Sequence, residues 1–232
     1  MAVDNRFVGI YDIPEAAIYL SHTPPFLNSD GVSTDKLRYW IRTSVPVINP
    51  PDLPISRRLI SFGDLISMRM VAIMRSRGVK LRDIRHAERY IRREFHIKYP
   101  FINKDIWTYG SNIFIQFEEQ LLSASRYGQS AMVFLKDWIR KVELDMTFDQ
   151  DNYVDSWNPY SDIILNPKIQ IGMPCIQGTR IPSLSIWRKM VAGDSPEVLA
   201  DLYDINLSQI AHVKEWEERL ERDGRKTPIS IG

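Results

Sequence analysis

The sequence predicts a mainly α-helical protein with small β elements (an α+β fold class), built as two modules around a short mixed segment. Its 232 residues exceed one typical domain and fall short of three. Helix start signals followed by apolar residues at helical spacing recur near both ends of the chain. Between them the pattern changes to short alternating runs, which are typical of strands. We therefore expect modules at 1–100 and 161–232, joined by a small mixed α/β segment at 101–160.

The composition is that of an ordinary folded protein, with 44% hydrophobic and 25% charged residues. No apolar run approaches the length that spans a bilayer, and the N-terminus lacks the basic-then-apolar pattern of a secretory signal. The single cysteine, Cys175, cannot form an internal disulfide, which fits a reducing compartment. Its apolar neighbours favour a packed thiol over a reactive one. We expect a cytoplasmic protein without a membrane partner.

The net charge of +1 conceals a strong asymmetry along the chain. Residues 36–98 contain 15 Lys and Arg against 5 Asp and Glu, a net charge of +10. The remaining residues contain 15 basic and 24 acidic side chains, a net charge of −9. A basic module attached to an acidic one predicts two different partners, a polyanion for the first and another molecule for the second. Taken alone, the basic stretch fits a solvated helix face as well as it fits nucleic-acid binding.

Two helix starts open the N-terminal module. Asp12 caps a first helix, and Glu15 completes its capping box. Ser33 caps a second helix, in which Leu37 and its neighbours at helical spacing face inward. The opposite face suits the major groove of DNA, because Arg and Lys read guanine edges or bind phosphates and hydroxyls reach backbone oxygens. With the capping serine, the candidate DNA-binding residues of this helix are Ser33, Thr34, Lys36, Arg38, Tyr39 and Arg42.

A proline-rich connection follows at 46–54, where proline excludes a helix. The β-branched residues beside it favour a short hairpin, or wing, over about 55–60. Arg57 and Arg58 are expected on this wing, where they would meet phosphates.

Two further helices complete the module. The third begins after Ser61, whose capping box is completed by Asp64, and it ends before Gly78. The fourth runs from about Leu81 to Phe95, with apolar residues on one face and arginines on the others.

Three motifs in this order resemble the DNA-binding domain of MerR-type regulators. They are "Val-Ser-Thr-Asp-Lys-Leu-Arg-Tyr-Trp" at 32–40, "Ile-Ser-Phe-Gly-Asp-Leu" at 60–65 and "Arg-Gly-Val-Lys-Leu-Arg-Asp-Ile" at 77–84. The resemblance implies a winged helix-turn-helix that binds double-stranded DNA. It assigns Ser33, Thr34, Arg38 and Tyr39 to the recognition helix, and Arg57 or Arg58 to the wing. The chain departs from that family in its longer connection at 21–30 and in lacking a coiled coil after the fourth helix, so a dimer must be built elsewhere.

The middle segment carries no chemical signature of its own. Residues 106–117 alternate around Gly110 and predict a β-hairpin. Residues 142–148 also alternate, and a helix is expected between the two at about 130–138.

Three helices are expected in the C-terminal module, at about Leu184–Ala192, Pro196–Leu202 and Leu207–Arg222. Ser195 starts the second of them, and a capping box at 206–209 starts the third.

The stretch before these helices has the form "Gly-x-Pro-x-Ile-x-Gly-Thr-Arg-Ile-Pro" from Gly172 to Pro182, and Ala192 to Glu197 have the form "Ala-Gly-x-Ser-Pro-Glu". Both closely resemble the signature of domain-of-unknown-function family 433, over about residues 162–220. That family recurs in VapB-type antitoxins, which are paired with PIN-like ribonuclease toxins. With the MerR-like half in front, the chain resembles a two-domain VapB-type antitoxin.

Two interpretations of the residues from Gly178 to Arg180 remain open. In the first they form a tight turn, in which Gly178 has a permissive φ and Thr179 and Arg180 hydrogen-bond the local backbone. In the second, Arg180 contacts a partner, since the carboxylate-rich active site of a PIN-like nuclease calls for a cation that forks onto carboxylates. The candidate partner-binding residues are Arg180, Arg222 and Arg225.

We expect no catalytic residue, no metal and no cofactor. The four histidines are scattered and have no cysteine partner. The acidic string from Glu143 to Asp155 lacks the glycine of a calcium-binding loop, because Val154 stands in that position. No phosphate-cradling loop or nucleophile elbow is present.

These observations predict an antitoxin that neutralises a PIN-like ribonuclease toxin through its acidic module and represses its own promoter through its basic one. A homodimer is expected, with its interface in the strand-like segment before Gly172 and the helices after it. The alternative is a ligand-responsive MerR-like transcription regulator without a toxin. An enzyme that processes nucleic acid is disfavoured, because the acids sit on one loop rather than converging on a metal.

Overall fold

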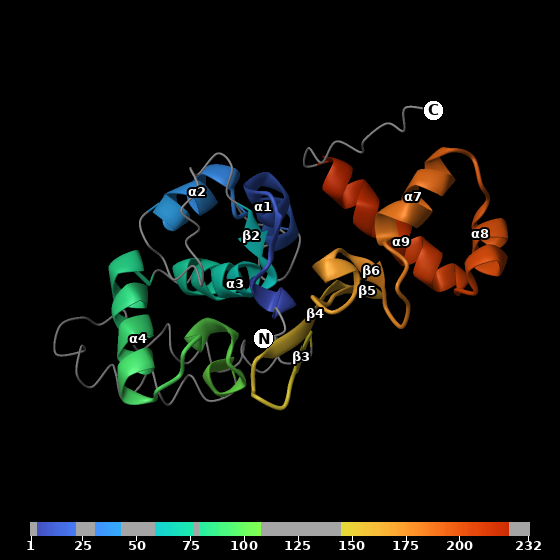
Figure 1. The fold of residues 1–232 in the computed structure, drawn as a ribbon. Coiled ribbons are helices and arrows are strands. Elements are labelled where there is room, and N and C mark those ends of the chain that lie inside the picture. The colour runs from blue at the N-terminus through green and yellow to red at the C-terminus, as the bar shows by residue number, and fades with distance from the viewer. Residues whose placement is uncertain (1–3, 22–30, 43–58, 77–78, 108–144, 223–232) are drawn as a thin grey trace. The chain divides into compact units, whose positions relative to one another are not determined.

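The computed structural model of the protein describes residues 4–21, 31–42, 59–76, 79–107 and 145–222 (Figure 1). The expected fold class, mainly α with small β elements, is confirmed. None of the described helices combines the length and the apolar content that crossing a membrane requires.

The chain divides into two compact units, each assembled from two separate stretches. The first contains Met1–Ile13 and Asp35–Asp155 and is called here the α3 unit after its central helix. The second contains Pro14–Thr34 and Ser156–Gly232 and is called the α9 unit. Residues 14–34, which we expected in the N-terminal module, thus group with the C-terminal helices.

Helix α3 is the centre of the α3 unit. The elements of this unit are η1 (Asn5–Phe7), β1 (Gly9–Tyr11), α2 (Thr34–Arg42), β2 (Ile60–Ser61), α3 (Phe62–Ser76), α4 (Leu81–Glu94), η3 (Pro100–Ile102) and β3 (Met146–Phe148). Helix α3 packs against α4, η1, η3, β1 and β2. Every residue from Phe62 to Met74 is buried, so the helix is surrounded on all sides.

The start of α3 contains the predicted capping box. The Ser61 hydroxyl accepts from the backbone N–H of Asp64 at 3.1 Å, and Asp64 Oδ2 accepts from the backbone N–H of Ser61 at 3.2 Å. These bonds satisfy donors that the first turn of a helix otherwise leaves unpaired. The two residues of β2 also pair with β1 in an antiparallel ladder, with Ser61 opposite Gly9 and Ile60 opposite Tyr11.

Helix α3 also buries a charge. The side chain of Arg69 is fully buried, and its Nη2 lies 3.5 Å from Asp145 Oδ2, whose side chain is 39% exposed. Burial lowers the pKa of Arg69 to about 10, although Asp145 favours its charged form. Burial likewise raises the pKa of Asp145 against the pull of Arg69. Desolvation therefore outweighs attraction in this pair.

The middle segment differs from its prediction at the point where it can be compared. Residues 104–107 are helical, so the predicted hairpin at 106–117 is wrong at its start. Trp107 is buried there, and its Nε1 donates to the carbonyl of Phe101 at 3.0 Å, which ties this turn to η3. The rest of that hairpin and the helix expected at 130–138 lie outside the described residues.

Helix α9 is the centre of the α9 unit. The elements of this unit are α1 (Ile13–Ser21), β4 (Val154–Tyr160), β5 (Ile163–Leu165), η5 (Gln170–Gly172), β6 (Cys175–Ile176), α7 (Ser183–Val191), α8 (Pro196–Tyr203) and α9 (Leu207–Arg222). Strand β5 lies between β4 and β6 and is antiparallel to both. The three helices expected here are confirmed within one residue at each end.

A stack of aromatic rings explains why α1 belongs to this unit. Trp216 of α9 is fully buried, and its ring lies 5.7 Å from that of Tyr19 in α1 and 6.2 Å from that of Tyr160 in β4. Both arrangements are stacked. Helix α1 therefore contributes to the core around α9.

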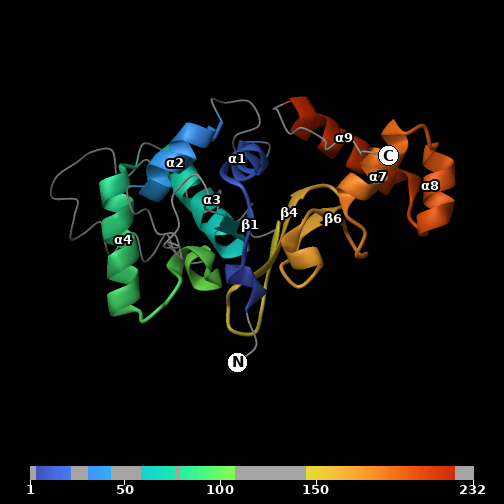
Figure 2. The same cartoon turned by 45° about the horizontal axis from the view of Figure 1, so that its top comes forward.

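Two hydrogen bonds join α7 and α9, which lie side by side in Figure 2. The Ser183 hydroxyl donates to Glu217 Oε1 at 2.5 Å, and Trp187 Nε1 donates to Glu221 Oε1 at 2.7 Å. The two donors are one helical turn apart on α7, and so are the two acceptors on α9. The bonds consequently fix the register of one helix against the other.

Candidate DNA-binding and partner-binding sites

Helix α2 exposes the side chains that the sequence analysis assigned to DNA. Leu37, Trp40 and Ile41 are buried at helical spacing, so the opposite face of the helix is left to solvent. Of the candidate residues, Ser33, Lys36, Arg38, Tyr39 and Arg42 are exposed and Thr34 is half-buried; the acid Asp35 is exposed beside them. Binding of DNA by these residues stays a prediction.

The cations of α2 are held loosely. Arg38 Nη1 lies 3.3 Å from Asp35 Oδ1, but the two side chains are 51% and 91% exposed. An ion pair so exposed contributes about 0–1 kcal/mol, so a phosphate can replace the aspartate at little cost. Arg42 lies in the last turn, where a positive charge is favoured by the helix dipole, and it has no ion pair among the described residues.

Helix α4 carries more arginines than α2, and three of them form ion pairs with acids of the same helix. Ion pairs within the helix join Arg82 with Asp83, Arg92 with Glu88 and Arg93 with Glu94. Arg82 and Arg93 are more exposed than Arg38, so α4 also presents cations that a polyanion could reach. The expected wing residues, Arg57 and Arg58, lie outside the described residues.

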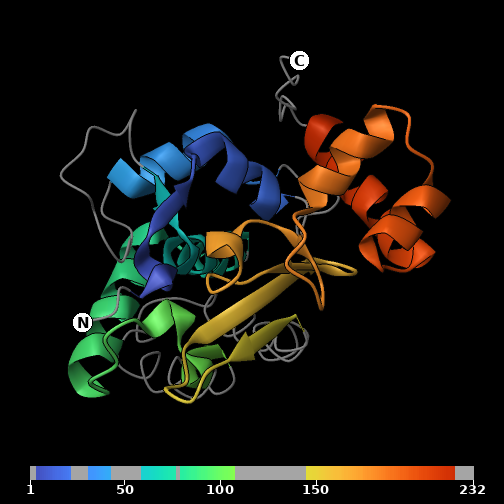
Figure 3. The same ribbon diagram turned by 45° about the vertical axis from the view of Figure 1, so that its right-hand side comes forward.

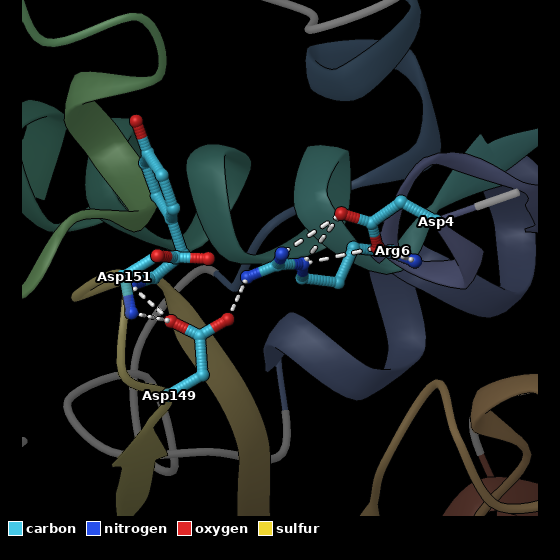
Figure 4. Close-up of polar contacts among 5 residues, drawn as sticks. Asp4, Arg6, Asp149 and Asp151 are labelled. Atoms are coloured by element: carbon cyan, nitrogen blue, oxygen red, sulfur yellow. Dashed lines mark hydrogen bonds and ion pairs between the residues drawn. The ribbon is translucent and has the colours of Figure 1, made fainter. Parts of the chain in front are cut away.

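Part of the acidic string in the middle segment serves a structural cluster, shown in Figure 4. Arg6 lies between two carboxylates, with Nη1 donating to Asp149 Oδ2 at 2.6 Å and Nη2 donating to Asp4 Oδ2 at 2.8 Å. Burial alone would lower the pKa of Arg6, but the two carboxylates outweigh it and raise that pKa. Asp149 Oδ1 also accepts from the backbone N–H groups of Asp151 at 3.0 Å and Tyr153 at 2.9 Å. Among the described residues, no group of three or more His, Cys, Asp and Glu is arranged to hold a metal ion.

The motif from Gly172 to Pro182 folds as a tight turn beside β6. Gly178 has a φ of +82°, which favours glycine. The Thr179 hydroxyl donates to the carbonyl of Ile176 at 2.9 Å and accepts from the backbone N–H of Ile181 at 3.0 Å. The turn interpretation is therefore confirmed for Gly178 and Thr179.

Arg180 does not follow that interpretation. Its side chain is exposed and makes no hydrogen bond or ion pair with any described residue, although its carbonyl accepts from Gln170 Nε2 at 3.2 Å. The turn thus holds the backbone of Arg180 in place and leaves its guanidinium in solvent. Beside it, burial raises the pKa of the Cys175 thiol to about 11, against the opposing effect of the Arg180 charge. The prediction of a packed thiol is confirmed.

The two other candidate partner-binding arginines lie at the end of the chain. Arg222 is the last residue of α9; it is exposed, and its Nε donates to the carbonyl of Glu218 at 3.3 Å. Arg225 lies outside the described residues.

Sequence reasoning missed a polar cluster on α9. His212 Nδ1 lies 2.7 Å from Asp162 Oδ2, at the turn between β4 and β5. One turn further along the helix, Glu215 accepts from the hydroxyl of Tyr160, and Arg219 Nη2 donates to the same hydroxyl at 3.2 Å. The partners come from segments about 50 residues apart, so spacing along the sequence gives no sign of them. The cluster fastens α9 to the β4–β5 hairpin.

Comparison with known proteins identifies part of the chain. The family described as "Protein of unknown function (DUF433)" matches residues 163–215. The match runs from β5 into α9 and includes Arg180, whereas Arg222 lies beyond it. No curated protein matches the sequence significantly.

One solved structure shares the fold. It is the X-ray crystal structure of Rv2018 from Mycobacterium tuberculosis, which is 18% identical to this chain and has a TM-score of 0.72. The similarity covers 89% of this chain and 98% of that one. Almost the whole Rv2018 chain therefore has the same arrangement of elements.

Proposed function

We propose that the protein is the antitoxin of a toxin–antitoxin pair. In this proposal the exposed face of α2, together with Arg57 and Arg58, which the sequence predicts on a wing, binds the protein's own promoter and represses it. The observation that carries the DNA-binding half is the exposure of Arg38, in a weak ion pair, and of Arg42 over a buried apolar stripe of α2. Such a surface suits phosphates and the major groove.

The toxin is proposed to be a PIN-like ribonuclease, bound by the α9 unit. The support is the match to the family of unknown function, which the sequence analysis associates with VapB-type antitoxins, together with the unpaired guanidinium of Arg180. An arginine held at the tip of a rigid turn is suited to a pocket of clustered carboxylates, because its planar fork binds two oxygens at once. Arg222 and Arg225 are proposed to add to this contact.

A dimer is proposed as well, because a two-fold operator calls for a two-fold protein. Its interface is proposed near the segment before Gly172, where Ile171 and Met173 expose 51% and 46% of their surface. Light scattering on the full chain and on an Ile171→Ser variant tests this, and an undiminished dimer in the variant would move the interface elsewhere.

An electrophoretic titration with promoter and random duplexes tests the DNA-binding half. Arg38→Ala or Tyr39→Ala should erode discrimination between the two by about 5- to 150-fold, because a good base contact is worth about 1–3 kcal/mol. Arg180→Ala is the matched control and should leave both affinities unchanged. A parent protein without preference for its promoter would refute this half.

Inhibition of the ribonuclease encoded beside this gene tests the other half. Arg180→Ala, and separately a chain ending at Arg222, should inhibit it less well than the parent while retaining DNA binding. If no such ribonuclease gene lies beside this one, the alternative of a regulator without a toxin takes precedence.

A further inference from the structure

The α9 unit exposes large apolar side chains around α8. Val191, Val198, Leu202 and Leu207 expose 65%, 56%, 62% and 52% of their surface, the four highest values for a large hydrophobic residue in the described part of the chain. Exposed apolar residues that occur singly need no explanation, but four within a stretch of 17 residues do.

The geometry of the helices brings these residues to one end of the unit. Val198 and Leu202 are four residues apart on α8 and so lie on the same face, while Leu199 between them is fully buried. Val191 ends α7 and Leu207 begins α9, and each is joined to α8 by a short turn. Figures 2 and 3 both show α8 at the side of this helix group away from the strands of its own unit. We call these four residues the α8 surface.

Acidic residues surround the α8 surface. Residues 190–213 contain four Asp and Glu and no Lys or Arg, a net charge of −4. All four acids, Asp194, Glu197, Asp201 and Asp204, are exposed. Asp194 makes a loose ion pair with Lys189 at 4.0 Å, and the other three make no ion pair with any described residue. The three acids without such a pair, Glu197, Asp201 and Asp204, stand next to the apolar residues along the chain, and the four acids together are called the acidic rim.

This combination selects among possible partners. DNA is disfavoured, since its phosphates would meet four carboxylates, which outnumber Arg188 and Lys189 in the last turn of α7. A second copy in a two-fold contact is disfavoured too, because the same acids would face one another across the axis. A protein surface with apolar side chains flanked by Lys or Arg can pack against the four apolar residues and pair with the surrounding acids.

We propose that the α8 surface is a docking site for a basic, apolar segment of a partner protein. Resting on the proposed function, that partner is the toxin, and the contact lies outside the turn that carries Arg180. The apolar centre supplies the affinity, and the acidic rim accelerates the encounter and rejects acidic surfaces. Arg180 would then act at the toxin active site, while α8 anchors a different part of the same protein.

The test uses the full chain and the purified ribonuclease encoded beside its gene. Val198→Ser with Leu202→Ser should weaken binding at least about 30-fold. Glu197→Lys with Asp201→Lys should slow association about tenfold and reduce its dependence on salt. The matched controls are Leu59→Ser, an exposed leucine of the α3 unit, and Asp151→Lys, an exposed acid of the same unit; neither should change binding. Every substituted side chain is exposed, so the midpoint of thermal unfolding should stay close to that of the parent, with a small decrease where Glu197→Lys places a cation in the first turn of α8.

The outcomes separate this proposal from the proposed function. If the parent binds the ribonuclease and both α8 variants bind it equally well, the α8 surface is overturned and the proposed function stands. If the parent binds no ribonuclease, the probe becomes an amphipathic Leu/Lys helix with a Leu/Glu helix as control. If the parent binds the Leu/Lys helix but not the Leu/Glu helix, and the α8 variants bind neither, the docking site is supported even though the partner is not the toxin. If the parent binds both helices equally well, or binds neither, the docking site is overturned. If the α8 variants no longer dimerise, the α8 surface is a self-association interface and the proposal is overturned. If they no longer bind the promoter, the surface contacts DNA and the proposal is overturned as well.

Discussion

Helix α2 and helix α8 are built alike and are charged oppositely. Each buries apolar residues on one face, Leu37 and Trp40 in α2 and Leu199 in α8. The exposed face of α2 consists of Lys, Arg and Tyr side chains beside Asp35, whereas the exposed face of α8 consists of Val, Leu, Asp and Glu side chains. The inward face fastens each helix to its own unit, so the outward residues are free to differ.

The difference teaches how one chain can serve two partners without confusing them. A phosphate backbone is attracted by the first surface and repelled by the second, and a basic protein segment has the reverse preference. The basic N-terminal part and the acidic C-terminal part of the sequence thus correspond, among the described residues, to the exposed faces of α2 and α8. Under the proposed function, selectivity between DNA and the toxin would need no switch, because the two surfaces carry opposite charges.

Salt should separate the two surfaces most strongly. Raising the salt concentration from about 50 mM to about 200 mM should weaken promoter binding by roughly 1,000-fold if about six phosphates are neutralised. Binding of the ribonuclease should fall less than about tenfold, because apolar contacts dominate it. Fluorescence anisotropy of both partners over the same salt series measures this. Equal slopes would show that the surfaces do not differ as proposed.

The buried thiol of Cys175 in the α9 unit should react slowly with thiol reagents, in contrast to the accessible side chains of α8. A thiol with a pKa of 9.0 is roughly 10% ionised at pH 8, whereas the raised pKa of Cys175, about 11, leaves roughly 0.1%. Labelling of Cys175 by a disulfide reagent should therefore be at least about 100-fold slower in the native protein than in denaturant, and should accelerate as the pH rises. Equal rates would mean that the turn beside Arg180 opens readily.

Substitution of Ser183 tests how much the hydrogen bonds between α7 and α9 stabilise the α9 unit, which carries the α8 surface. Ser183→Ala removes a donor from the buried carboxylate of Glu217 and should lower the free energy of unfolding by about 1–3 kcal/mol. Ser185→Ala, an exposed serine on the same helix, is the control and should change it by less than about 0.5 kcal/mol. Urea denaturation measures both. The affinity for promoter DNA should be unchanged in either variant.

The smallest expected effect concerns the acid on α2. Asp35→Asn breaks an exposed ion pair with Arg38 and should alter the free energy of unfolding by less than about 0.5 kcal/mol. Affinity for the promoter should rise about two- to threefold, because a carboxylate near the phosphates is removed. Asp83→Asn on α4 provides the control, with no rise expected. A loss of affinity in Asp35→Asn would mean that the pair orients Arg38 for binding.

Local features were predictable from the sequence, and contacts between distant segments were not. The capping box at Ser61, the bounds of α7 to α9 and the turn at Gly178 each depend on residues within one or two turns of one another. The helical state of residues 104–107 was missed, because the alternating pattern did not show that Trp107 is tied to Phe101.

The candidate sites divide in the same way. Exposure of the α2 residues followed from helical spacing, which also predicts the burial of Leu37. The pairing of His212 with Asp162 did not, since nothing near either residue signals the other. The exposed apolar residues of α8 were also missed, because a sequence pattern cannot distinguish an apolar residue that packs from one that awaits a partner.

The interleaving of the two units has a consequence for the order of synthesis. Helix α1 is translated near the beginning of the chain, but Trp216, on which Tyr19 stacks, follows roughly 200 residues later. At about 5–20 residues per second, α1 must wait roughly 10–40 s on the ribosome before its place in the core exists. During that time its apolar residues Ala16, Tyr19 and Leu20 lack the burial they have in the finished protein. A chain whose synthesis stops before α9 therefore leaves this helix accessible to chaperones and proteases. Once α9 has been synthesised, Tyr19 can stack on Trp216.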